Sequence, residues 1–262
     1  PELVRQGRQQ ERMNMTKREL YSLVPISQSR GKKVRSMWLD EKRLQDGVVS
    51  VRSRCVAMEF NLYDRTDTYA GTPPLKFKLI ISRAATKRRS GSPDWTRVLG
   101  LYDIVTAFWH ADLPLDEPIT VIPPRGEEEP GWVWQMHKAM YGTRRASQLF
   151  LEFMVTVFEH CGYRALKVSR QVFYSEKYDS LAALHGDDII NEGEPECLDY
   201  FDGAVKPLCN IKILARIGPN ASGMGRYLKR FICYIPGFGY EWNEDPKHVK
   251  SIIDSTGKQG AK

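Results

Sequence analysis

Acidic residues stand inside two apolar stretches of the sequence, where the neighbouring residues favour burial. One stretch is Leu101-Tyr102-Asp103-Ile104-Val105, and the other is Leu184-His185-Gly186-Asp187-Asp188-Ile189-Ile190. Buried carboxylates lose their hydration and repel one another, so they persist only beside a compensating cation. Two divalent ions about 3.5–4 Å apart would supply that charge, and such a pair is the usual apparatus for in-line nucleotidyl transfer. Magnesium suits this role because it takes oxygen ligands and lets substrate phosphates complete its shell.

Each stretch also has an ordinary structural explanation. A single aspartate at a strand end, such as Asp103, is more often a helix N-cap or a turn residue. Gly186-Asp187-Asp188 is a good turn sequence in its own right. The pattern alone therefore leaves both explanations open, and the functional one depends on further motifs along the chain.

The elements that would position these acids alternate between strand and helix. Strands are predicted at 96–104, 119–122, 132–136, 171–175, 181–184 and 211–217, with a hairpin formed by 36–39 and 48–60. Helices are predicted at 75–88, 144–161 and 194–205, with a last one from Pro246 to a C-cap at Gly257. Arg52 and Arg54 lie two residues apart on the second hairpin strand, so the pleat projects both from one face. Strands interleaved with helices indicate the α+β class.

The composition is that of a globular protein. The 262 residues are 42% hydrophobic and 27% charged, which is enough for a core in one or two domains. No stretch approaches the roughly 18–20 apolar residues of a membrane span, so no membrane partner is expected. The chain begins at Pro1 without a signal-peptide core, and we expect an intracellular fragment cut from a longer protein. Five scattered cysteines favour neither a disulfide framework nor a zinc site.

Most of the net charge of +7 lies near the N-terminus. The first 35 residues hold nine Lys or Arg against three Asp or Glu, and they are polar without a sustained period. We therefore expect a basic flexible arm at 1–35, with no more than a helical turn near 16–23. Such an arm attracts polyanions without specifying which. A second basic run lies between Asp67 and Asp94, where no acid occurs, and its ordinary interpretation is a solvated helix face.

Further motifs follow in the same order along the chain as in a known family. They are Val51-Arg52-Ser53-Arg54-Cys55-Val56-Ala57, Thr68-Tyr69-Ala70-Gly71-Thr72-Pro73-Pro74-Leu75-Lys76, Asp103-Ile104-Val105-Thr106-Ala107-Phe108, Lys138-Ala139-Met140-Tyr141-Gly142 and Asp245-Pro246-Lys247-His248. From about Trp38 to Thr256, the sequence resembles the reverse transcriptases of copia-type LTR retrotransposons. The Asp-x-x-Thr-Ala-Phe and Lys-x-x-Tyr-Gly motifs, followed by the double aspartate, are specific as a set.

The resemblance implies a right-hand polymerase fold, in which an antiparallel palm sheet joins fingers and a partial thumb, and RNA-directed DNA polymerase activity. The fingers would span 36–95 and the palm 96–211, with a fingers-side segment at about 119–150. Residues 212–262 would form a partial thumb or connection. The implied partners are an RNA template, a DNA primer and dNTPs. The implied cofactor is a pair of Mg²⁺ ions, for which Mn²⁺ can substitute.

The resemblance also implies a role for each matching residue. Asp103 and Asp187 would bridge the two metal ions, and Asp188 would be the third acidic residue of the palm. Phe108 would block a ribose 2′-OH and so select deoxynucleotides, although core packing beside Trp109 is its ordinary alternative. The remaining residues would hold the substrates: Arg52 and Arg54 the triphosphate, Tyr141 and Gly142 the nucleotide near the template base, and Lys76, Lys78, Lys138 and His185 the nucleic acid. Bidentate phosphate binding favours arginine.

Three positions depart from the family pattern. His185-Gly186 stands where many relatives carry Tyr-x, and the turn is also similar to that of viral RNA-directed RNA polymerases. Ser147 stands where relatives usually have a proline. Met58-Glu59 replaces a common Lys-Gly, and an acid near a phosphate grip is unhelpful. Two alternatives to a live reverse transcriptase therefore stay open: a catalytically decayed fragment that only binds nucleic acid, and an RNA-directed RNA polymerase.

Overall fold

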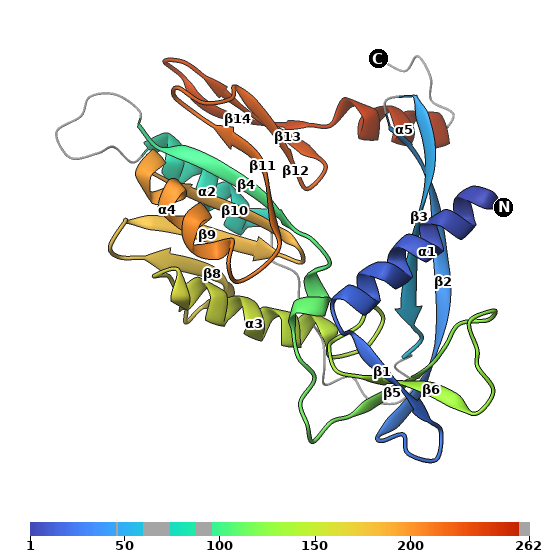
Figure 1. Ribbon diagram of the computed structural model, residues 1–262. Helices are drawn as coiled ribbons and strands as arrows, with labels where there is room; N and C mark the ends of the chain where they lie inside the picture. The colour runs from blue at the N-terminus through green and yellow to red at the C-terminus, as the bar shows by residue number, and fades with distance from the viewer. Residues whose placement is uncertain (46, 60–73, 87–95, 257–262) are drawn as a thin grey trace. The chain divides into compact units, whose positions relative to one another are not determined.

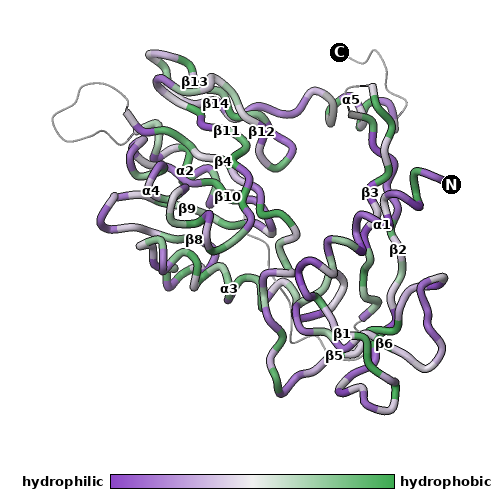
Figure 2. Tube along the Cα trace, in the orientation of Figure 1, coloured by the Kyte–Doolittle hydropathy of each residue, from purple (hydrophilic) through white to green (hydrophobic). Residues whose placement is uncertain are grey.

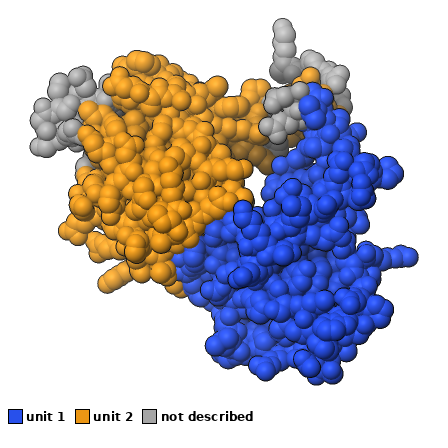
Figure 3. All heavy atoms as spheres, viewed as in Figure 1, with its two compact units in different colours: residues 1–70, 106–153 blue, residues 71–105, 154–262 orange. Residues whose placement is uncertain are grey.

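The computed structural model (Figure 1) describes residues 1–45, 47–59, 74–86 and 96–256. The turn residue Asp46, the motif residues 68–73, the basic residues 87–89 and the C-cap Gly257 lie outside the described residues. The chain divides into two compact units, coloured separately in Figure 3. Unit 1 comprises residues 1–70 and 106–153, and unit 2 comprises residues 71–105 and 154–262.

Unit 1 is built on a five-stranded sheet with strand order β1-β6-β5-β2-β3. Its strands are β1 (Tyr21–Pro25), β2 (Lys32–Gln45), β3 (Val48–Ala57), β5 (Ile119–Ile122) and β6 (Trp132–Met136). Neighbouring strands are antiparallel except β2 and β5. A short 3-10 helix, η1 (Ala107–His110), contributes the buried Trp109 to a core that also contains Met15, Leu20, Trp134 and Met136.

The N-terminal residues are folded, and the prediction of a flexible arm at 1–35 was wrong. Helix α1 (Glu2–Lys17) packs along β3, and its Met15 is fully buried. Gly7 approaches β3 so closely that a Cβ there would lie 2.6 Å from the Val51 carbonyl oxygen. The helix escaped detection because only a narrow face meets the sheet, and that face includes a glycine rather than a run of apolar residues.

Unit 2 is built on a six-stranded antiparallel sheet with strand order β11-β4-β10-β9-β8-β7. Its strands are β4 (Val98–Ile104), β7 (Arg164–Leu166), β8 (Ser169–Ser175), β9 (Ser180–His185), β10 (Asp188–Gly193) and β11 (Ile211–Ile217). The two strands that carry the acidic stretches, β4 and β10, are neighbours in the middle of this sheet. Both are almost entirely buried up to their acidic ends.

Helices cover the sheet of unit 2 on both faces. Helix α2 (Pro74–Thr86) packs Phe77 and Ile80 into a core with alternate residues of β4 and β10, among them Leu101 and Ile190. On the other face, Tyr102 meets Phe201 of α4 (Pro195–Val205) at 5.4 Å between ring centroids. Phe158 of α3 (Ala146–His160) stacks on Phe173 of β8. Figure 2 shows hydrophobic residues along α3.

A small sheet of three strands follows β11 in unit 2. It consists of β12 (Met224–Tyr227), β13 (Arg230–Ile235) and β14 (Gly239–Glu244), and α5 (Pro246–Thr256) comes after it. Tyr227 and Ile232 join the core beneath α2. Gly225 allows β12 to lie close to the larger sheet, because a Cβ there would be 2.7 Å from Ile217 and 2.9 Å from Leu101.

The α+β class is confirmed, and the strands predicted at 119–122, 132–136 and 211–217 have the predicted limits. The helices predicted at 144–161 and 194–205 are confirmed, with shifts of at most two residues at their ends. The helix predicted at 75–88 is confirmed and begins one residue earlier, and its predicted end lies outside the described residues. No helix among the described residues is long and apolar enough to cross a membrane.

Candidate functional site

The double aspartate lies in a tight turn between β9 and β10. His185 and Asp188 form the last pair of the β9–β10 ladder, so Gly186 and Asp187 are the two turn residues. Gly186 has φ +60°, and a two-residue turn with glycine first is typical of the type II′ hairpin. A Cβ at Gly186 would meet no atom within 4 Å, so the backbone conformation alone favours glycine there. The turn presents Asp187 as an exposed residue.

Strand register brings the first acidic stretch beside this turn. Asp188 pairs directly with Asp103 across β10 and β4, and the Ile104 N–H donates a 2.8 Å hydrogen bond to the Asp187 carbonyl oxygen. Residues opposite each other on antiparallel strands have Cβ atoms roughly 4.5–5.5 Å apart on the same face. The structure therefore brings Asp103, Asp187 and Asp188 together, from segments more than eighty residues apart.

The three carboxylates repel one another. The pKa of Asp188 is raised to about 7, first by its burial and then by the negative charges of Asp187 and Asp103. A carboxyl group with this pKa is about half protonated near neutrality. A cation placed among these side chains would reverse the effect, because it would favour the ionised form of Asp188.

The acidic edge formed by Asp103, Asp187 and Asp188 fits an ion that shares its shell with a substrate. Within the part of the chain that the structure describes, no group of three or more His, Cys, Asp or Glu side chains forms a ready-made metal cage. Magnesium does not require one, since it is usually held by one or two carboxylates, waters and substrate phosphates. Exposed Asp187 and half-buried Asp103 can each offer carboxylate oxygens to such an ion.

Two more polar residues flank the acidic edge in the same row. His185 lies opposite Asp188, with its ring 5.7 Å from that of Phe77 and its buried Nδ1 without a hydrogen-bond partner. Lys212 of β11 lies opposite Asp103 on its other side. The sequence analysis did not single out Lys212. Simple alternation along β11 would put Lys212 on the opposite face from Ala215, which packs with Leu101, but the register shifts between Ile213 and Ala215 and brings Lys212 opposite Asp103. Only the structure shows this shift and that β11 is the neighbour of β4.

A second group of predicted residues assembles in unit 1, at the end of β3. Arg52 and Arg54 project from one face, as predicted, and Ser53 between them is buried on the other. Burial, followed by the charges of Arg54 and Arg43, lowers the pKa of Arg52. The Arg54 guanidinium lies 5.5 Å from the centre of the Tyr141 ring. We call Arg52, Arg54 and Tyr141 the cationic cluster.

The Tyr141-Gly142 loop is attached to β3 through its backbone. The Ala57 N–H donates to the Tyr141 carbonyl oxygen at 2.7 Å, and the Glu59 N–H donates to that of Gly142 at 3.3 Å. Gly142 has φ +84°, and a Cβ there would lie 2.0 Å from the Ala57 carbonyl oxygen. Both the conformation and the space therefore require glycine. This attachment holds Tyr141 and Gly142 of the Lys-x-x-Tyr-Gly motif beside the strand that carries the two arginines.

Phe108 lies beside the same loop. Its ring is 5.0 Å from that of Tyr141 and 5.9 Å from that of Phe150, and it is half-buried, whereas Trp109 is buried in the core. The partial exposure of Phe108 leaves ring surface available to a ligand. The predicted roles of Phe108, Tyr141 and Gly142 stay predictions, but the residues are neighbours.

The predicted nucleic-acid residues are dispersed, and several have protein partners. Lys138 pairs with Asp112 at 2.7 Å, the Lys76 ammonium donates to Ser169, and Lys78 lies 5.9 Å from the Trp242 ring centre. Glu59, the departure from the family pattern, is also engaged: it pairs with Lys32 at 2.9 Å and accepts the Arg144 N–H at 2.9 Å. Glu59 thus helps to hold the loop at the end of β3.

Comparisons with known proteins identify the type of fold. No family model and no curated protein matches the sequence. The structure resembles that of telomerase from Candida albicans in complex with a fragment of telomeric RNA, with a TM-score of 0.54 and 7% identity over 90% of this chain and 49% of that one. A foamy viral protease-reverse transcriptase in complex with double-stranded DNA has a TM-score of 0.48 and 12% identity over 98% of this chain and 48% of that one.

The chain spans about half the length of these matched chains. The likeness to the Candida albicans telomerase shows that the two chains share a fold, and the chain therefore has a telomerase-type fold.

Proposed function

We propose that the chain is the reverse transcriptase domain of a copia-type retrotransposon, which adds dNTPs to a DNA primer on an RNA template. The observation that carries this proposal is the register of β4 and β10, which pairs Asp103 with Asp188 beside the Asp187 turn. The burial and the negative neighbours that raise the pKa of Asp188 support a cation at this edge. The telomerase-type fold and the motifs shared with copia-type enzymes support the reaction class.

In this proposal Asp103, Asp187 and Asp188 would hold two Mg²⁺ ions, with Mn²⁺ as a substitute. Bound there, the ions would lower the barrier to attack by the primer hydroxyl and stabilise the leaving pyrophosphate. Fingers at 36–95, a palm at 96–211 and a partial thumb at 212–262 remain part of the proposal.

The cationic cluster would bind the triphosphate. The guanidinium groups of Arg52 and Arg54 can each make two hydrogen bonds to phosphate oxygens, and their mutual repulsion would fall when an anion binds. Phe108 and Tyr141 would bound the sugar and base, so that a ribose 2′-OH would meet the Phe108 ring. Lys76, Lys78, Lys138 and His185 would contact the template or the primer.

Primer extension on an RNA template with Mg²⁺ and dNTPs tests the proposal. We expect Asp103→Asn and Asp187→Asn each to reduce the rate about 10³-fold, because each removes a charged metal ligand. Asp199→Asn is the matched control, since Asp199 is an exposed residue of α4 outside the acidic edge. If the wild-type chain incorporated no dNTP under conditions where a related enzyme works, the proposed polymerase activity would be overturned.

The same experiment separates the two alternatives. The decayed fragment would be selected if the chain did not polymerise but bound nucleic acid in a salt-sensitive way, and if both Asp→Asn variants kept this binding. The excess of basic residues at 1–35 favours such binding. Incorporation of ribonucleotides that Phe108→Ala leaves unchanged would select the RNA polymerase. For a reverse transcriptase we expect Phe108→Ala to increase ribonucleotide incorporation.

A further inference from the structure

Helix α1 packs along β3, which is an edge strand of the sheet in unit 1. Gly7, Glu11 and Met15 are spaced four residues apart, so they lie on one face of this helix. A Cβ at Gly7 would lie 2.6 Å from the Val51 carbonyl oxygen, and Met15 is fully buried. Between them, the Glu11 carboxylate accepts the Cys55 N–H. The face that α1 packs against β3 therefore carries an acid at its centre.

Glu11 is buried, with 8% of its surface exposed. Such a carboxylate requires hydrogen bonds or positive charges, and here the Cys55 N–H and the guanidinium groups of Arg52 and Arg54 supply them. Burial outweighs these partners and raises the pKa of Glu11 to about 7. Burial also raises the pKa of the Cys55 thiol, to about 12, so that this group is neutral. The acid beside the two arginines is therefore ionised above neutrality and uncharged below it.

The charged residues of α1 on either side of Glu11 are already paired. Arg8 pairs with Asp40 of β2 at 2.6 Å, and Arg12 pairs with Glu127 at 2.5 Å. These two ion pairs hold the helix against unit 1 and leave little net charge beside the sheet. Ionised Glu11 is thus the uncompensated charge that the described residues of α1 present to the arginines of β3.

Glu11 acts on the same arginines that form the cationic cluster. Burial, then the charges of Arg54 and Arg43, lower the pKa of Arg52, and Tyr141 and Glu11 oppose this effect. Glu11 therefore stabilises the charged arginines while the cluster holds no anion. A polyphosphate bound there would bring several negative charges close to the same acid. Charges at partly buried sites interact over several ångströms, because water screens them incompletely.

We propose that ionised Glu11 weakens the binding of polyphosphates to the cationic cluster, so that helix α1 sets the affinity of this site. The inference rests on the proposed role of the cluster in binding the triphosphate. Glu11 does not touch the anion but acts through Arg52 and Arg54. Each nucleotide addition releases pyrophosphate, and a counter-charge that lowers the affinity for polyphosphates would speed its departure. Protonation of Glu11 at lower pH would remove this counter-charge.

Calorimetric titration of the full chain with sodium tripolyphosphate, in the absence of Mg²⁺, tests the proposal without polymerase activity. At about pH 8.5, Glu11→Gln should lower the Kd about three- to tenfold, because glutamine can still accept the Cys55 N–H but carries no charge. At about pH 6 the two chains should bind alike, since Glu11 is then mostly protonated. Comparison at the same pH cancels the titration of the probe itself. A purely structural role would predict weaker or unchanged binding.

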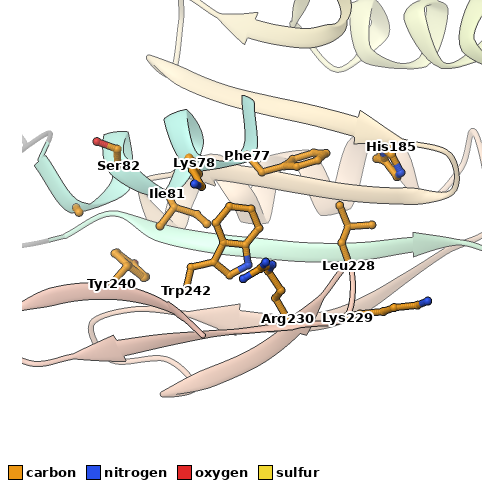
Figure 4. A pocket seen from close by; sticks show the side chains of 11 residues that line it. Phe77, Lys78, Ile81, Ser82, His185, Leu228, Lys229, Arg230, Tyr240 and Trp242 are labelled. Atoms are coloured by element: carbon orange, nitrogen blue, oxygen red, sulfur yellow. The ribbon is translucent and has the colours of Figure 1, made fainter. Parts of the chain in front are cut away.

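Two control variants and one reference variant accompany this titration. Glu2→Gln removes an exposed acid from the same helix and should leave the Kd unchanged. Lys229→Gln should also leave it unchanged. Lys229 lies with Lys78 and Arg230 along a cleft of about 790 Å³ in unit 2 (Figure 4), so this variant detects an anion bound at those cations instead. Arg54→Gln should raise the Kd at least about tenfold, because it removes a cation of the cluster.

A second measurement uses the wild-type chain and decides if Glu11→Gln does not fold. By thermodynamic linkage, saturating tripolyphosphate should raise the pKa of Glu11, which ¹³C NMR of its carboxyl carbon follows. The proposal is overturned if this pKa does not move, if Glu11→Gln binds no more tightly than the wild type at about pH 8.5, or if Lys229→Gln weakens binding.

The reference variant distinguishes failure of this inference from failure of the proposed function. Absence of tripolyphosphate binding by the wild type, or binding that Arg54→Gln leaves intact, would overturn both the effect of Glu11 and the triphosphate role of the cluster. Binding that depends on Arg54 but not on the charge of Glu11 would overturn only the inference about α1.

Discussion

The acidic edge in unit 2 and the cationic cluster in unit 1 are both built from like charges. The acidic edge lies on inner strands of its sheet, whereas the cationic cluster lies on an edge strand of another sheet. Asp103 and Asp188 lie on β4 and β10, which have strands on both sides, so register alone fixes their separation. Arg52 and Arg54 lie on β3, which is an edge strand, and a loop attached by backbone hydrogen bonds supplies Tyr141. The acidic edge is therefore set by the core, whereas the cationic cluster depends on one loop attachment.

The electrostatics of the two regions are complementary in sign. Burial and negative neighbours raise the pKa of Asp188, and burial and positive neighbours lower that of Arg52. In each region the protein alone leaves a charge poorly compensated, which binding of an ion of opposite sign would relieve. A dication would relieve the charge of one region and a polyphosphate that of the other.

Substitution of one glycine in each region, Gly142 beside the cationic cluster and Gly186 beside the acidic edge, should give the largest difference in stability. Gly142→Ala should lower the free energy of unfolding by at least about 3 kcal/mol, because the new Cβ would clash with the Ala57 carbonyl oxygen in addition to the strain of a positive φ. Gly186→Ala should lower the free energy of unfolding by only about 1 kcal/mol, because the new Cβ has space and only the φ of +60° disfavours alanine there. Urea denaturation of both variants measures the difference. Equal losses would show that the loop is not attached to β3 as described.

The cationic cluster should affect nucleotide affinity more than the chemical step. Arg54→Gln should raise the KM for dNTPs about ten- to hundredfold with a smaller change in kcat, because it removes a charge-assisted phosphate contact. Arg164→Gln is the control, because Arg164 is an exposed residue of β7 in unit 2 and does not belong to the cationic cluster. Primer-extension kinetics at varied dNTP concentration measure both. A loss in kcat alone would place Arg54 outside the triphosphate site.

The sequence predicted the three aspartates of the acidic edge better than it predicted the residues around them. Apolar residues around Asp103 and around the Asp187-Asp188 pair indicated burial, and the single acid of one stretch together with the double acid of the other pointed to a shared site. Which strands are neighbours is a property of the whole sheet, so the position of Lys212 opposite Asp103 could not be read from local pattern. Nor could the close approach of Gly142 to Ala57, which joins residues far apart in the chain.

The error at the N-terminus has a similar cause. Helix α1 is polar on most of its surface, and one of its buried residues is Glu11, which a periodicity search counts as exposed. Its carboxylate accepts the Cys55 N–H and lies near Arg52 and Arg54. Tertiary contacts of this kind decide whether a polar segment folds, and composition cannot show them.

The pH dependence of stability should distinguish the two regions. The pKa values of Asp188 and Glu11 are both raised to about 7 in the folded chain. For a carboxyl group shifted upward, the folded state is fully favoured below the unfolded pKa and loses this advantage as pH rises toward 7. Asp188→Asn and Glu11→Gln should each flatten the decline in unfolding free energy between about pH 4 and 7, by about 1–2 kcal/mol after allowance for solvent screening.

Magnesium separates these two contributions. Added Mg²⁺ should raise the unfolding free energy at pH 7 and reduce the part of the decline that Asp188 causes, because a cation favours its ionised form. It should leave the part caused by Glu11 unchanged, since the charged groups near Glu11 are the arginines of the cationic cluster. Thermal melts across this pH range, with and without Mg²⁺, measure both. An equal response of the two variants to Mg²⁺ would argue against an ion at the acidic edge.

The smallest expected effect concerns Lys138, whose exposed ion pair with Asp112 lies outside both charged regions. Breaking this pair from either side should change the unfolding free energy by no more than about 0.5 kcal/mol. Only Lys138→Gln removes a cation from the surface, so it should reduce the slope of log affinity for nucleic acid against log salt by about one, and Asp112→Asn should not. Filter binding at several salt concentrations measures the slopes. If both variants weakened binding equally, the ion pair would act by holding the loop, and Lys138 would not contact phosphate.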